Sequence, residues 1–137
     1  MKFSEFFTTD NIHLDKRTLV ILRWIANIGQ FISISAVYFI FNFKLPFFYC
    51  STIILTGILT NLYLQIIVKE NQLSNKKASV YLLYDLIQLA LLLFLTGGAT
   101  NPFIILLIIP AIVSSTFLTL RSTINLSIIT ILILVIL

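Results

Sequence analysis

The sequence YDLIQLALLLFLTGGATNPF, residues 84–103, decides how this chain folds. It opens with a carboxylate, Asp85, and an amide, Gln88, inside an apolar run, and it closes with a turn rich in glycine, asparagine and proline. Polar side chains are costly in the interior of a membrane, so they need partners there and often mark function. The segment therefore predicts a membrane helix, a tight turn and the start of a second helix.

Composition places the chain among integral membrane proteins. Of its 137 residues, 59% are hydrophobic and 10% are charged, whereas about a quarter of the residues in a soluble domain are charged. The net charge of +4 does not indicate nucleic-acid binding, because the basic residues are scattered between apolar segments and form no patch. The single cysteine, Cys50, excludes an internal disulfide and a multi-cysteine metal cluster, and we expect no metal.

The sequence predicts an all-α, polytopic helical bundle that follows a polar leader. The leader covers residues 1–17, and a single transmembrane domain covers residues 18–137. A helix needs about 20 apolar residues to cross a bilayer. We expect four complete spans and a shorter fifth apolar segment, at about 18–41, 45–68, 78–96, 102–120 and 123–137.

The fifth segment is shorter than a full span and ends without a polar flank. We therefore expect a fragment of a longer protein, cut inside its fifth membrane helix. The gene sequence beyond Leu137 would test this expectation.

Lysine and arginine residues lie mainly on one side of the predicted bundle. Only Lys44 falls in a connection on the opposite side, and seven basic residues fall in the leader, the 69–77 loop and the turn at residue 121: Lys2, Lys16, Arg17, Lys69, Lys76, Lys77 and Arg121. Because such residues favour the cytoplasmic side, we expect a multi-pass membrane protein with a cytoplasmic N-terminus.

Polar residues inside the first and third spans form two stripes. Arg23, Asn27 and Gln30 share one face of the first helix, and Asp85 and Gln88 share one face of the third. Arg23 and Asp85 also lie at similar depths, so we expect an intramembrane polar network in which these two residues can pair. Alternatives are that Arg23 extends toward the headgroups, that the amides only hold helices together, or that Asp85 relays protons.

The residues of the turn after the third span fit two interpretations, an ordinary hairpin turn and a ligand site. Gly97 and Gly98 suit a left-handed helix end, and Asn101 followed by Pro102 suits an N-cap and the first residue of a helix. Free N–H groups at that helix start can polarise a ligand carbonyl, and Phe103 offers an aromatic face. A quinone arriving from the lipid has this chemistry, although an ordinary hairpin turn explains the same residues.

The heptapeptide GGATNPF, residues 97–103, resembles the G-G-x-x-N-P-F motif between the third and fourth membrane helices of the RegB/PrrB family of redox-responsive sensor histidine kinases. Residues 83–89 and 95–96 resemble the third helix of that family, and residues 17–30 resemble its first helix. The resemblance implies a parent protein with six helices in the bacterial inner membrane, which senses the ubiquinone pool. It also implicates this motif in quinone binding, through Gly97, Gly98, Asn101, Pro102 and Phe103.

The resemblance also implies partners beyond the membrane lipid and the quinone pool. In the family, oxidised quinone lowers the net kinase output, the signal passes to a response regulator in a phosphorelay, and the kinase is a homodimer. We expect the kinase core to lie outside this chain, so no catalytic residue is assigned, and we expect His13 to be a solvated leader residue. Competing interpretations are a non-signalling quinone-binding membrane subunit and a small transporter or anchor fragment.

Overall fold

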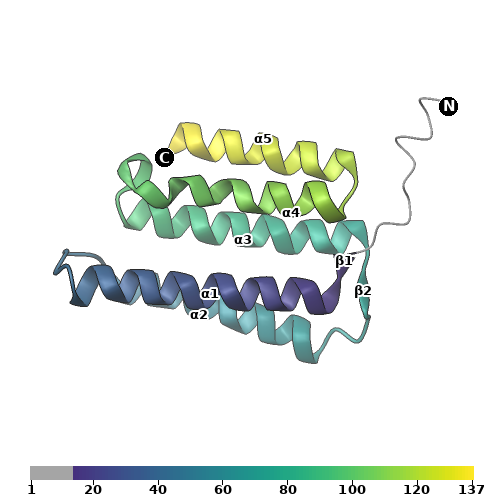
Figure 1. Ribbon diagram of the computed structural model, residues 1–137, viewed down its shortest axis with the longest axis horizontal. Helices are drawn as coiled ribbons and strands as arrows, with labels where there is room; N and C mark the ends of the chain where they lie inside the picture. Colours follow the sequence, from purple (N-terminus) through teal and green to yellow (C-terminus); the bar gives the residue numbers. More distant parts are fainter. Residues whose placement is uncertain (1–13) are drawn as a thin grey trace.

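The computed structural model describes residues 14–137, and His13 and most of the leader lie outside this range. Figure 1 shows α3 in the middle of a helical bundle, with α1 and α2 on one side and α4 and α5 on the other. The elements in chain order are β1 (Leu14–Asp15), α1 (Lys16–Phe39), α2 (Phe47–Ile66), β2 (Gln72–Leu73), α3 (Asn75–Leu95), the 3-10 helices η2 (Gly98–Thr100) and η3 (Pro102–Ile108), α4 (Ile109–Phe117) and α5 (Leu120–Ile136).

The helices confirm the predicted all-α membrane fold. Within the described residues, α1, α2 and α3 are long and apolar enough to cross a membrane, and two further apolar helices, Pro102–Phe117 and Leu120–Ile136, are shorter. Large apolar side chains cover the outside of the bundle, as Val135 at 80% and Ile136 at 83% exposed illustrate. Hydrocarbon is the solvent that suits such a surface. How many of the helices cross the bilayer stays a prediction.

The segment expected as a fourth span is not a uniform α-helix. Residues 102–108 form 3-10 turns, and regular α-helix begins only at Ile109. Pro110 lacks the N–H that would bond to the carbonyl of Leu106, and its ring crowds that carbonyl. The α-helical ladder therefore cannot run unbroken through this segment.

The connection to α5 lies earlier in the chain than expected. Leu118 is extended, with φ −115° and ψ 175°, and the Thr119 hydroxyl accepts a hydrogen bond from the N–H of Ser122. A threonine in this position caps a helix. The helix therefore starts at Leu120, and Arg121 and Ser122 belong to its first turn.

A short antiparallel strand pair joins the end of the leader to the loop before α3. Leu14 pairs with Leu73, Asp15 pairs with Gln72, and both leucines are buried. The Lys16 ammonium also donates to the carbonyl of Val68 at 2.6 Å. The leader end and this polar loop therefore lie at the same end of the bundle.

Asn75 ties the start of α3 to the connection between α4 and α5. Its Oδ1 accepts from the N–H of Thr119 at 2.9 Å, and its Nδ2 donates to Oγ of Ser122 at 2.7 Å. Because Ser74 caps α3, the helix begins three residues before the expected span. The α4–α5 pair is thereby attached to α3 at the end of the bundle that carries β1 and β2.

Candidate functional site

Arg23 of α1 forms an ion pair with Asp85 of α3. Its Nε lies 2.9 Å from Asp85 Oδ1, and its Nη2 donates to the Thr60 hydroxyl of α2 at 2.8 Å. Arg23 is 2% exposed, so it does not extend toward the headgroups. One guanidinium therefore connects three helices.

Two tyrosines of α3 surround the same guanidinium. The Cζ atom of Arg23 lies 5.3 Å from the ring centroid of Tyr81 and 5.6 Å from that of Tyr84. A cation within about 6 Å of an aromatic ring is attracted by the electron-rich face of that ring. Tyr84 also donates from its hydroxyl to that of Thr56 at 3.0 Å. The positive charge is thus held by a carboxylate, a hydroxyl and two rings.

Three amides meet one to two turns further along α1. Gln88 Nε2 donates to Asn27 Oδ1 and to Gln30 Oε1, each at 3.0 Å. Gly57 of α2 packs against this cluster, and a Cβ atom there would lie 2.6 Å from Asn27 Oδ1 and closer still to Gln88 Oε1. The cluster therefore needs a glycine on the facing helix.

The structure brings together all five residues of the two polar stripes in the first and third helices. Sequence reasoning missed the contribution of α2, namely Gly57 and Thr60. The segment TGILTN, residues 56–61, was the available signal, because small and polar residues in a membrane helix often mark a helix–helix contact.

The 97–103 turn has the backbone expected from its sequence. Gly97 and Gly98 have φ of 122° and 57°, values that a residue with a side chain rarely adopts. Asn101 Oδ1 accepts from the N–H of Phe103 at 2.9 Å, which caps η3 with Pro102 as its first residue. Asn101 Nδ2 donates to the hydroxyl and the carbonyl of Thr96 at 2.8 and 3.2 Å. The side chain of Asn101 is therefore engaged within the turn.

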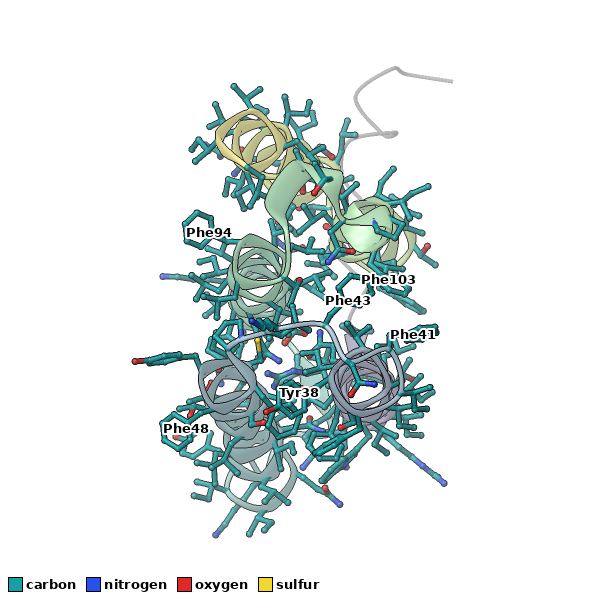
Figure 2. The ribbon with its side chains drawn as sticks, turned by 90° about the vertical axis from the view of Figure 1, so that its left-hand side faces the viewer. Tyr38, Phe41, Phe43, Phe48, Phe94 and Phe103 are labelled. Atoms are coloured by element: carbon teal, nitrogen blue, oxygen red, sulfur yellow. The ribbon has the colours of Figure 1, made fainter. Side chains whose placement is uncertain are left out.

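A cavity of about 670 Å³ joins the turn to the ion pair. It lies between α1 and the η3–α4 segment, against α3. Arg23, Gln30 and Asp85 line one end, which we call the polar end, and the other end, which we call the turn end, is lined by Phe41, Phe43, Thr96, Thr100, Asn101, Pro102 and Phe103. Figure 2 shows Phe43 and Phe103 near the space between α1 and the η3–α4 segment.

The two ends of the cavity are separated by apolar walls. Between Asp85 and Thr96 the cavity is lined by Leu89, Leu92 and Leu93. Thr96 follows Asp85 by 11 positions, which corresponds to about 16 Å along a helix. The sequence had suggested two separate features, a packing element and a sensing turn. In the structure, both line the same cavity.

Metal binding has no support in the part of the chain that the structure describes. Within residues 14–137, no group of three histidine, cysteine or acidic side chains is placed to hold an ion. Cys50 is buried in a small apolar cluster with Ile34, Ile54 and Leu92. It packs there as a small apolar side chain.

The fold and the site define a multi-pass helical membrane protein that contains a partly buried ion pair and a ligand-sized cavity. Over 109 residues, 79% of its length, the chain is 37% identical to the sensor histidine kinase RegB of Cereibacter sphaeroides. The resemblance to the RegB family is thereby confirmed, and the chain is a sensor-kinase membrane region of the RegB type.

The aligned region amounts to 24% of that kinase, so the chain spans about a quarter of its curated relative. No protein-family profile matches the chain, and no solved structure matches it.

Proposed function

We propose that this membrane region senses the redox state of the quinone pool by binding a quinone in the cavity between α1 and the η3–α4 segment. The observation that carries the proposal is the placement of the GGATNPF turn and the Arg23–Asp85 pair around one apolar cavity. Its volume of about 670 Å³ lies within the range of about 300–1,000 Å³ typical of ligand pockets. An apolar cavity with few polar groups suits a ring that carries carbonyls and an apolar tail.

The residues of the turn have two roles in this proposal. Pro102 and Phe103 line the cavity and would contact the ligand. Gly97, Gly98 and Asn101 hold the turn in shape, because the glycines adopt positive φ and the asparagine bonds to both flanks of the turn. Gly97 and Gly98 do not line the cavity, so replacing either glycine would move Phe103 without removing a ligand contact, whereas Asn101 both shapes the turn and lines the cavity.

Signalling would follow from a change in how helices pack around the ligand. The cavity has walls on α1, α3 and the η3–α4 segment, so an occupant contacts both halves of the bundle. A ligand shifts a conformational equilibrium only when it binds one arrangement better than the other. We propose that the bundle has two packing arrangements and that a bound quinone favours one of them. The change in packing would pass to a cytoplasmic kinase core in a homodimeric sensor, and from the kinase to a response regulator.

The distribution of basic residues supports a cytoplasmic N-terminus. Six of the basic residues in the described part of the chain lie at one end of the bundle, at the starts of α1, α3 and α5 and in the loop between α2 and α3. Lys44 lies in the connection between α1 and α2, at the other end. This asymmetry favours the basic end on the cytoplasmic side of a bacterial inner membrane. The turn end of the cavity would then lie toward the outside.

A variant that fills the cavity tests the proposal. Gly29 lines the cavity, and a Cβ atom there would have no neighbour within 4 Å, so Gly29→Phe adds a large side chain in open space. Ile28 is 52% exposed and does not line the cavity, so Ile28→Phe is the matched control. We would measure the affinity of a short-tailed ubiquinone for the protein in lipid nanodiscs. Gly29→Phe should weaken binding about tenfold or more, and Ile28→Phe should leave it unchanged. Equal affinity of Gly29→Phe and wild type would exclude this cavity as the site.

A further inference from the structure

We infer that Arg23 supplies the hydrogen bond that holds the ligand, by donating from Nη1 to a carbonyl oxygen at the polar end of the cavity. The polar ring would then lie beside α1 and the Arg23–Asp85 pair, and the apolar tail would extend toward the 97–103 turn. This inference rests on the proposed function, because it assumes that the cavity takes an apolar molecule that carries a carbonyl. It assigns a ligand-binding role to a residue outside the GGATNPF turn.

One nitrogen of the buried guanidinium is left without an acceptor. Nε is paired with Asp85 and Nη2 with Thr60, whereas Nη1 is buried and has no hydrogen-bond partner. A buried donor without an acceptor is unfavourable, the more so when the donor is charged. Arg23 is among the residues that line the cavity, so a ligand carbonyl oxygen that came within hydrogen-bond distance of Nη1 would remove this penalty.

Gln30 offers a second donor at the same end. Its Oε1 accepts from Gln88, and its Nε2 donates to no residue in the described part of the chain. Gln30 lies seven residues after Arg23 on the same face of α1, and both line the cavity. The polar end therefore combines a charged donor with an amide donor.

The turn end has its polar side chains already engaged. Asn101 Nδ2 donates to two oxygens of Thr96, and Asn101 Oδ1 accepts from the N–H of Phe103. Thr100 donates from its hydroxyl to the carbonyl of Gly97 at 2.8 Å. A ligand carbonyl at this end would have to compete with the contacts that shape the turn, whereas Arg23 Nη1 has no contact to lose.

Photolabelling would locate the ring directly. The probe is a short-tailed benzoquinone with an azide on the ring, bound to the protein in nanodiscs, illuminated and mapped by peptide mass spectrometry. The inference predicts label on α1 near Leu22 and Ala26, two residues that line the cavity beside Arg23. Label confined to residues 100–103 would overturn the inference but leave the proposed function intact. Absence of any label that unlabelled ubiquinone displaces would overturn both.

A conservative variant tests the hydrogen bond itself. Arg23→Lys keeps a positive charge for Asp85 but has a single nitrogen and cannot supply Nη1. A charge-assisted hydrogen bond corresponds to about a tenfold change in affinity or more, so Arg23→Lys should bind the short-tailed ubiquinone at least tenfold more weakly. Arg17→Lys is the matched control, because Arg17 is exposed at the start of α1 and does not line the cavity, and its affinity should stay within about twofold of wild type.

Infrared spectroscopy of the wild-type protein gives a measurement that does not depend on whether a variant folds. In wild-type protein, one carbonyl stretch of ¹³C-labelled ubiquinone should lie below the frequency seen in apolar solvent, as hydrogen bonding requires. In Arg23→Lys, the frequency of this carbonyl stretch should return toward the value seen in apolar solvent. An unshifted carbonyl in wild type, or unchanged affinity in Arg23→Lys, would overturn the inference.

Discussion

Arg23 and Asp85 lie 62 residues apart in the chain, and their ion pair is 2.9 Å long inside the helical bundle. With Thr60 as a further partner, the pair connects all three of the long helices. Removing one member of a buried pair leaves an uncompensated charge, which is far more destabilising than the net contribution of the intact pair. The pair therefore favours the observed register of α1 against α3.

The ion pair predicts strong coupling in a double-mutant cycle. Arg23→Gln and Asp85→Asn should each lower the free energy of unfolding, and the double variant should be more stable than the sum of the two losses implies, by about 1–3 kcal/mol. Reversible unfolding in mixed detergent micelles measures these values. Additive effects would show that the two side chains do not interact.

Two glycines of neighbouring helices should respond in opposite ways to the same substitution. Gly57→Ala places a methyl group against Asn27 and Gln88, and overpacking of this kind costs about 1–3 kcal/mol. Gly29→Ala meets no atom within 4 Å, and replacing a helical glycine should stabilise the protein by about 0.5–1 kcal/mol. The same unfolding assay measures both variants. Equal stabilities would contradict the close packing of α2 against the amide cluster.

Asn101 should stabilise the turn through two distinct contacts. Asn101→Asp keeps the oxygen that accepts from Phe103 N–H but loses the donor to Thr96, whereas Asn101→Ala loses both. Loss of a helix cap costs about 1 kcal/mol, so amide hydrogen exchange at Phe103 should accelerate clearly in the alanine variant and much less in the aspartate variant. Equal acceleration in both variants would show that Oδ1 does not cap η3.

Asn75 should determine how firmly α5 is attached to the bundle. Asn75→Ala removes the acceptor for Thr119 N–H and the donor to Ser122. Each hydrogen bond contributes about 0.5–1.5 kcal/mol, so limited proteolysis at the α4–α5 connection should become several-fold faster. The control is Ser79→Ala, which removes only a bond within α3. Similar proteolysis rates for the two variants would contradict this role of Asn75.

Helical periodicity and local turn chemistry account for what could be predicted from the sequence. The spacing of Arg23, Asn27 and Gln30 predicts one polar face because the turn of an α-helix is constant, and two glycines followed by asparagine and proline predict the turn between α3 and η3. These features depend on residues close together in the chain.

The features that could not be predicted depend on which helices become neighbours. Gly57 and Thr60 acquire their roles only because α2 packs against α1 and α3. The β1–β2 pair is two residues long on each side, too short for a recognisable pattern, and the 3-10 geometry of residues 102–108 depends on how Pro110 interrupts the ladder. The cavity is likewise a property of the packed bundle, because its walls come from segments on α1, α3 and α4 that are distant in sequence.

The most direct test of quinone sensing through this cavity is a kinase measurement. The matching membrane region of the Cereibacter sphaeroides RegB kinase would be replaced by this chain, and autophosphorylation would be measured in vesicles that contain oxidised or reduced ubiquinone. We predict lower output with oxidised quinone for wild type and for Ile28→Phe, and no dependence on the quinone redox state for Gly29→Phe. An undiminished redox response in Gly29→Phe would contradict the assignment of sensing to the cavity.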